Sequence, residues 1–82
     1  AIVRGVRLRE ADLSRVRCQD GSIRDADLSG ADFDGADFTD CDLRGSDLSS
    51  LDPARVRLKG AIIDMQQALS LVQAMGLDVR AD

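Results

Sequence analysis

Residues 26–50 divide into five blocks of five residues, ADLSG, ADFDG, ADFTD, CDLRG and SDLSS. Each block runs from a small residue through Asp to Leu or Phe, and then to a polar and a turn-forming residue. The same five-residue spacing extends back to residue 1, and the third residue of every block in residues 1–50 is apolar. These third-place residues are Val3, Leu8, Leu13, Cys18, Ile23, Leu28, Phe33, Phe38, Leu43 and Leu48. Helices and strands repeat their faces about every 3.6 and 2 residues, so neither maintains a step of five. The stretch therefore predicts an internal repeat that decides the fold.

The first place of each block is also small or apolar, so two side chains per block are expected to point inward and three outward. Glycine occupies the last place at residues 5, 30, 35 and 45, which suits a tight corner because glycine tolerates positive φ. Blocks that turn at each corner stack into coils whose backbones pair at a spacing of roughly 4.8 Å. The pattern predicts a solenoid in which each coil contacts only its neighbours.

The blocks ADLSG, ADFDG and ADFTD resemble the pentapeptide-repeat family, whose pattern is A(D/N)LXX. The resemblance implies an all-β solenoid, namely a right-handed quadrilateral parallel β-helix with four blocks per coil. It covers residues 1–50, although residues 15–24 keep the apolar places and lose the aspartate. After a break at Pro53 the phase returns, which extends the expected β-helix domain to residues 1–63 with an irregular last coil. The returning positions are Val56, Leu58, Ala61 and Ile63.

Residues 64–82 form a second unit, in which the period changes. Asp64 is a good N-cap, Gln67 completes a capping box, and Gly76 suits the position after a helix. A helix is predicted between them because apolar residues recur at steps of three and four, at Met65, Ala68, Leu69, Val72 and Met75. A short strand is expected at residues 77–79, where apolar residues alternate.

Leu71 widens the apolar stripe of this helix beyond what the end of one coil requires, which predicts one surface for the coil and another for a partner. The order of last coil, helix and tail, VRLKGAIIDMQQALSLVQAMGLDV, resembles the C-terminal module of the Qnr and MfpA-type quinolone-resistance proteins. That resemblance implies a homodimer through the C-terminal helix, with a monomeric cap as the alternative. The residues expected at the dimer interface are Met65, Leu69, Val72, Met75, Leu77 and Val79.

The net charge of −4 is unevenly distributed. Residues 1–19 carry +3, residues 20–50 carry −7, and residues 51–82 are neutral. A basic first coil therefore precedes an acidic band. With four blocks per coil, four aspartates are expected to lie together although like charges in adjacent strands are unfavourable, and they are Asp12, Asp32, Asp34 and Asp52. Other polar residues also suit an outward place, so the fold is not expected to require aspartate there.

The Qnr and MfpA-type resemblance implies a DNA mimic that binds bacterial type II topoisomerase, either DNA gyrase or topoisomerase IV, and is linked to fluoroquinolone resistance. The alternative is a structural or assembly module with no topoisomerase partner, in which the aspartates provide a solvated face. The acidic surface expected to bind gyrase consists of Asp27, Asp32, Asp34, Asp37, Asp42 and Asp47.

Other classes of protein are disfavoured. The chain has no His, Tyr or Trp, and its carboxylates are spread along the repeat, so no enzyme, cofactor or metal site is expected. The acidic band argues against direct nucleic-acid binding, and no apolar run is long enough to span a membrane. Cys18 and Cys41 are expected to be small core residues rather than a disulfide or a redox pair, which together with the lack of a signal sequence predicts a cytoplasmic protein. Because Ala1 stands within a repeat, either a fragment of a longer protein or an unusually short member of the family is expected.

Overall fold

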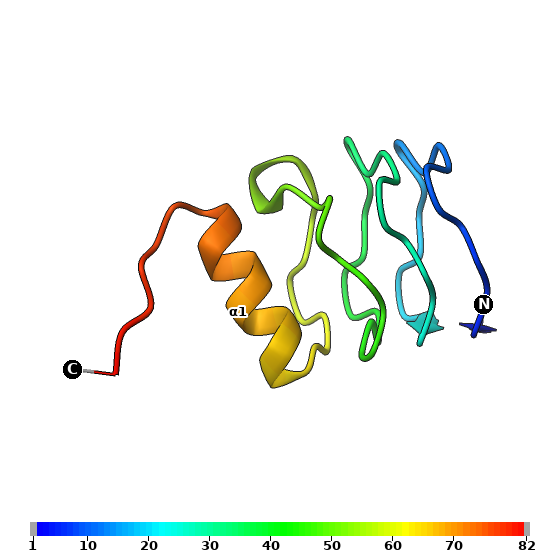
Figure 1. Ribbon diagram of the computed structural model, residues 1–82. Helices are drawn as coiled ribbons and strands as arrows, with labels where there is room; N and C mark the ends of the chain where they lie inside the picture. The colour runs from blue at the N-terminus through cyan, green and yellow to red at the C-terminus, as the bar shows by residue number, and fades with distance from the viewer. Residues whose placement is uncertain (1, 82) are drawn as a thin grey trace.

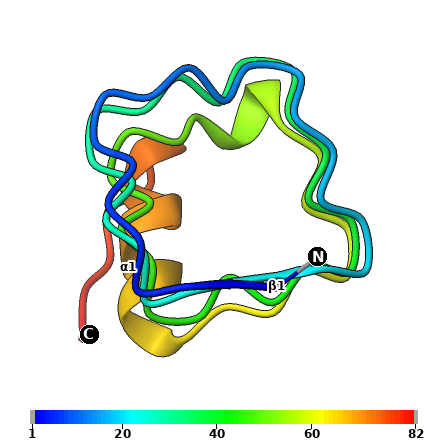
Figure 2. The ribbon, with the colours of Figure 1, turned by 90° about the vertical axis from the view of Figure 1, so that its right-hand side faces the viewer.

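The computed structural model describes residues 2–81, with side chains from Arg4 onward. Ala1, the first residue of the predicted β-helix domain, and Asp82, the last residue of the predicted C-terminal unit, lie outside the described residues. The chain winds into a column of coils, and a helix closes the column near the C-terminus (Figure 1). The molecule is rod-like, with extents of 40 × 22 × 19 Å. Viewed along the column, successive coils superimpose in a four-sided outline (Figure 2).

Neighbouring coils pair in parallel with a register of 20 residues. Strands β1 (Ile2–Arg4) and β2 (Ser22–Arg24) pair residue for residue. Because the chain turns at every fifth residue, the remaining pairs are single bridges, namely Arg7–Asp27, Asp12–Asp32, Arg17–Asp37, Ser22–Asp42, Asp37–Arg57 and Asp42–Ile62. This register corresponds to four blocks per coil, and the chain is a parallel β-helix.

Each corner is a four-residue turn. The N–H of a first-place residue donates to the C=O of the preceding third-place residue, as Ala31 does to Leu28 at 3.1 Å. The third turn residue has positive φ, as in a type II turn, and Gly30 adopts φ +70° there. The predicted corner glycines are confirmed, but the same conformation also occurs at non-glycine residues, which are Glu10, Arg15, Asp20, Asp25 and Asp40. Coil stacking therefore overrides the preference for glycine at half of these corners.

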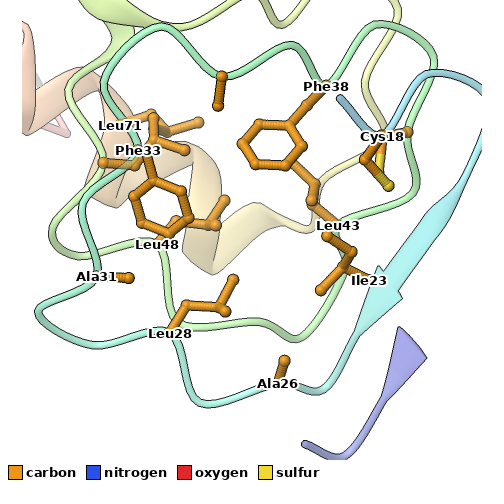
Figure 3. Close-up of a cluster of buried hydrophobic side chains, with 13 residues drawn as sticks. Cys18, Ile23, Ala26, Leu28, Ala31, Phe33, Phe38, Leu43, Leu48 and Leu71 are labelled. Atoms are coloured by element: carbon orange, nitrogen blue, oxygen red, sulfur yellow. The ribbon is translucent and has the colours of Figure 1, made fainter. Parts of the chain in front are cut away.

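First-place and third-place side chains fill the interior of the column (Figure 3). Leu28, Phe38 and Leu43 are completely buried. The rings of Phe33 and Phe38 meet edge to face, with centroids 6.0 Å apart and an interplanar angle of 68°. The first coil is less well covered, since one neighbouring coil packs on it, and its partly buried members include Leu8, Leu13 and Val16.

The third coil departs from the repeat where the sequence predicts a break. Residues Pro53–Arg55 form a 3-10 turn, η1, and the carboxylate of Asp52 caps it by accepting the N–H of Ala54 at 3.0 Å. On this side the bridge between Asp12 and Asp32 does not continue to Asp52, and the Gly35 N–H instead donates to the C=O of Arg55 at 2.8 Å. The bridges resume at residue 57 and end at residue 62.

Helix α1 (Met65–Ala74) closes the column, and no helix within residues 2–81 is long and apolar enough to cross a membrane. The Asp64 carboxylate accepts the Gln67 N–H, and the Gln67 side chain accepts the Asp64 N–H, both at 2.9 Å. The predicted capping box is therefore confirmed. Gly76, at φ +83°, ends the helix in a Schellman motif, as its sequence position predicts.

The short strand predicted at residues 77–79 is wrong. Residues 77–81 pair with no strand in this chain, and Figure 1 shows this tail leading away from the coils. A strand needs a neighbour that satisfies its backbone groups, and one copy of the described chain places no neighbour there. Alternation of apolar residues alone was therefore insufficient to predict a strand.

Candidate functional site

The aspartate of each block performs a structural task that the sequence did not predict. Its carboxylate accepts the backbone N–H two residues further on, which forms an Asx turn ahead of the corner. Asp32 accepts in this way from Asp34 at 3.0 Å. The same contact occurs at Asp12, Asp27, Asp37, Asp42, Asp47 and Asp52. The carboxylate therefore stabilises the turn, but the fold does not require aspartate at this place, as expected, because Arg17 and Ile62 occupy it in other blocks and still form bridges between coils.

Hydrogen bonds to these carboxylates favour their charged form. The Ser29 hydroxyl, followed by the Ser29 backbone N–H, holds the pKa of Asp27 below its usual value. The guanidinium of Arg44, 2.8 Å away, lowers the pKa of Asp42 to about 2. A hydroxyl two residues further on likewise lowers the pKa of Asp12 and Asp37. These four carboxylates are consequently ionised at neutral pH.

The six aspartates predicted as one gyrase-binding surface lie on four different sides of the column. Residues twenty positions apart share a side, whereas residues five positions apart lie on adjacent sides (Figure 2). We number the four sides in the order in which the chain passes along them within a coil. The first side holds Asp42, the second Asp27 and Asp47, the third Asp32 and Asp34, and the fourth Asp37. The six aspartates therefore do not form the predicted single surface. Residues at the same place in successive blocks lie at the same distance from a corner, but on different sides of the column.

Two of the six carboxylates serve contacts within the fold. Asp37 is buried, with 9% of its surface exposed, and it stacks between Arg17 and Arg57 in the ladder of the fourth side. Asp42 is paired with Arg44 at 2.8 Å. Neither carboxylate offers a free charge to a partner, and both are removed from the candidate surface.

The third side of the column carries four exposed aspartates, Asp12, Asp32, Asp34 and Asp52, which we name the acidic side. Asp12 and Asp32 pair through a bridge, as the repeat predicts. Among residues 2–81 neither of them forms an ion pair within 4.0 Å. Arg55 partly neutralises one end of the acidic side, since its guanidinium lies 3.1 Å from Asp34 and 3.6 Å from Asp52.

Asp27 and Asp47 line a groove of about 760 Å³ between the second side and the start of α1. Asp25 and Asp64 also line it, and neither was predicted as a surface residue. The groove is less strongly acidic than its four aspartates alone would make it. Arg9 lies 3.8 Å from Asp27, and Asp64 is already engaged as the helix cap.

Two residues of α1 attach the helix to the column, and their packing was not predicted from the sequence. Leu71 is 8% exposed and joins the buried cluster around Phe33 (Figure 3), so it is not a second outward edge. Gln67 is 6% exposed, and its Nε2 donates to the C=O of Leu43 at 2.5 Å and of Ser46 at 2.8 Å. A glutamine next to the apolar stripe of the helix could have indicated this buried contact, but its role in the capping box already explained its presence.

The remaining apolar side chains of the C-terminal unit are exposed. Met65, one turn before Leu69 on α1, has 82% of its surface exposed, and Leu69 has 47%. Val72 is partly buried, which leaves five of the six predicted interface residues exposed. We name as the outer apolar face the exposed residues Ile62, Met65, Leu69, Met75, Leu77 and Val79.

A family model described as pentapeptide repeats matches the chain in eight copies, over residues 1–30 and 11–49. The matched part is more than half of the 82 residues. The chain therefore belongs to the pentapeptide-repeat proteins. No curated protein matches it significantly.

Solved structures provide a second comparison. A trypsin-treated variant of QnrB1, a plasmid-mediated fluoroquinolone resistance protein, matches with a TM-score of 0.57 and 28% identity over 90% of this chain and 45% of that one. Full-length QnrB1 matches with a TM-score of 0.47 and 30% identity over 94% and 38%. The pentapeptide-repeat protein Rfr23 from the cyanobacterium Cyanothece 51142 matches with a TM-score of 0.41 and 26% identity over 79% and 44%. The chain spans less than half the length of each of these proteins.

Proposed function

We propose that this chain binds a bacterial type II topoisomerase, DNA gyrase or topoisomerase IV, at its DNA-binding surface and changes the enzyme's response to fluoroquinolones. The proposal rests on the acidic side, where Asp12 and Asp32 are exposed, stacked and without cationic partners among residues 2–81. The likeness to QnrB1, at 28% identity over 90% of this chain, supports the choice of partner. The chain would act by occupying a binding site and would catalyse no reaction.

A row of carboxylates on a rod can substitute for a row of phosphates. Successive coils of a β-helix place equivalent residues roughly 4.8 Å apart, whereas phosphates along one DNA strand advance by roughly 3.4 Å per nucleotide. The rod's narrower extents, 22 and 19 Å, give it a width close to that of a DNA duplex. Its acidic side would therefore attract the cationic groups that normally contact DNA.

We further propose that two copies of the chain associate through the outer apolar face. Met65 and Leu69 expose apolar surface that the column does not use, and the tail adds Leu77 and Val79. Burying apolar surface contributes about 25 cal/mol per Å², which favours pairing of two such faces. A two-fold pair would place the two columns at opposite ends of a longer rod and extend the acidic sides.

Binding to purified gyrase tests the partner. The variant Asp12→Asn, Asp32→Asn, Asp34→Asn removes three charges from the acidic side but retains an acceptor for each Asx turn. The matched control Asp20→Asn, Asp40→Asn, Asp47→Asn removes the same charge from exposed positions on other sides. Asn readily adopts the positive φ found at residues 20 and 40.

We expect wild type and control to bind gyrase with an affinity that falls as salt rises, because salt screens exposed charges. The acidic-side variant should associate roughly 10-fold more slowly or worse. Equal binding by both variants would reject the acidic side as the contact. Absence of binding by a folded wild-type chain would instead favour a structural or assembly module.

Light scattering after size exclusion tests the pairing. The wild-type chain should have the mass of two copies, and Leu69→Asp should have the mass of one, because a carboxylate cannot be buried in an apolar interface without a partner. Gln66→Asp, an equal charge change at an exposed position of the same helix, should remain a pair. A monomeric wild type, or a paired Leu69→Asp variant, would contradict the proposed interface.

A further inference from the structure

The two cysteines meet inside the column. The Sγ atoms of Cys18 and Cys41 are 3.3 Å apart, and both thiols are free. Cys41 is fully buried, whereas Cys18 has 9% of its surface exposed. We expected both to be small core residues, on different sides of the column because they lie 23 residues apart. The structure confirms two free cysteines in the core, and it adds that they are in contact, since side chains from adjacent sides converge in the narrow interior.

The register of the coils explains this convergence. Cys18 is the last inward residue before a corner, and the next first-place residue is Gly21. Cys41 stacks over Gly21, because Ser22 and Asp42 form a bridge and the Asp42 N–H donates to the Gly21 C=O at 3.0 Å. Glycine has no side chain, so nothing at residue 21 occupies the space between the two thiols.

We propose that Cys18 and Cys41 are a redox-active dithiol that a hydroperoxide converts into an intrachain disulfide joining neighbouring coils. The Cys18 thiolate attacks the O–O bond of hydrogen peroxide, which forms a sulfenic acid and releases hydroxide that is protonated to water. The Cys41 sulfur, as it loses its proton, then attacks the Cys18 sulfur and displaces a second water. Two thiols thereby supply the two electrons and two protons that reduce one peroxide to two molecules of water.

The different burial of the cysteines assigns the order of these steps. Cys18 is the residue that retains exposure, and it belongs to the less well covered first coil. Burial raises the pKa of the Cys41 thiol to about 12, so this group remains protonated at neutral pH and is a poor first nucleophile. Transient opening of the first coil would admit peroxide to Cys18, and reclosure would return Cys18 to Cys41.

The cross-link would join the first coil, whose inward side chains are only partly buried, to the better-buried coils that follow. A disulfide that closes a loop of 23 residues restricts the unfolded chain, and loops of this size stabilise a fold by on the order of 100-fold in the unfolding equilibrium. The inference concerns the column alone and does not depend on a topoisomerase partner.

Peroxide treatment of the folded chain, followed by denaturation and alkylation with N-ethylmaleimide, tests the inference. Intact mass should show the loss of two hydrogen atoms and no alkylation, and tryptic peptides should link Cys18 to Cys41. The oxidised chain should unfold at higher urea than the reduced chain, by on the order of 100-fold in the unfolding equilibrium, and dithiothreitol should reverse the shift.

Cys41→Ala provides the control, because alanine is the commonest first-place residue of the repeat and should preserve the fold. After peroxide this variant should show no urea shift and no intrachain link. Cys18→Ala gives the same control from the other partner. Two alkylated cysteines in the treated wild type, a link between two chains, a sulfinic acid, or a disulfide without stabilisation would each overturn the proposal.

Discussion

The second coil and the C-terminal unit use their apolar side chains differently. In residues 21–40 every third-place side chain is buried, from Ile23 to Phe38. In residues 65–81 only Leu71 is buried among the large apolar side chains, and Met65 is 82% exposed. The repeat therefore satisfies its own core within one chain, whereas the C-terminal unit carries apolar surface that the column does not need. That surplus is why we assign pairing to the C-terminal unit and charge recognition to the coils.

The largest expected contrast is between Phe38→Ala and Met65→Ala. Phe38 is completely buried against Phe33, so its truncation should lower the free energy of unfolding by about 3–5 kcal/mol. Met65→Ala should change it by less than about 0.5 kcal/mol when measured on the monomer. Urea unfolding followed by circular dichroism, in the Leu69→Asp background, provides both values. Similar losses for the two variants would remove the distinction between the regions.

Gln67→Ala probes a polar link between the regions, which stands beside the hydrogen bond of 3.0 Å from the Gly45 N–H to the Asp64 carboxylate. It would leave the C=O groups of Leu43 and Ser46 without their buried donor, so we expect a loss of about 1–3 kcal/mol. Gln66→Ala, a neighbouring exposed position, should be nearly neutral. The two variants are compared by urea unfolding. A neutral Gln67→Ala would mean that the packing of Leu71 and the hydrogen bond from the Gly45 N–H to Asp64 suffice to hold α1 on the column.

A smaller effect separates charge from hydrogen bonding on the acidic side. Asp32→Ala removes the acceptor for the Asp34 N–H and should cost about 1 kcal/mol, as loss of a capping side chain does. Asp32→Asn keeps the acceptor and should cost little. Thermal unfolding of the two variants at neutral pH makes the comparison. If Asn is as costly as Ala, charge stabilises the turn and the gyrase-binding variants must be redesigned.

The smallest effect is a pH dependence that arises in the coils. The pKa of Asp42 is about 2 in the folded chain against an ordinary 3.8, so its stabilisation is fully present above about pH 4 and is lost as pH falls towards 2. Asp42→Asn should flatten the fall in urea midpoint across this window. Arg44→Gln should do the same by removing the cation that holds this pKa down. Curves parallel to wild type in both variants would contradict the assignment.

The step of five residues predicted a solenoid because ten successive apolar third places admit no helix or plain strand, and the resemblance to pentapeptide-repeat proteins implied the four-sided β-helix. Capping signals predicted α1 because they are local, and the structure confirms both Asp64 and Gly76 in their roles. Non-glycine corners such as Arg15 could not be predicted, since their positive φ is imposed by the stacked coils. Features that depend on neighbouring residues in the chain could be predicted from the sequence, whereas features that depend on the stacking of coils could not.

The candidate site was harder to predict than the fold. Five of the six aspartates share the second place of the block, but that place recurs on every side of the column. Only the twenty-residue register separates an exposed stack such as Asp12 and Asp32 from a buried carboxylate such as Asp37. The meeting of Cys18 with Cys41 was missed for a related reason, because it occurs across a corner and not along a side.

A gyrase supercoiling assay, with the chain titrated in the presence and absence of a fluoroquinolone, tests the central claim most directly. We expect the wild-type chain to inhibit supercoiling or to relieve the effect of the drug. The Asp20, Asp40 and Asp47 control should act in the same way, and the Asp12, Asp32 and Asp34 variant should be inactive. Full activity of that last variant, or no effect from a folded and paired wild-type chain, would contradict the account.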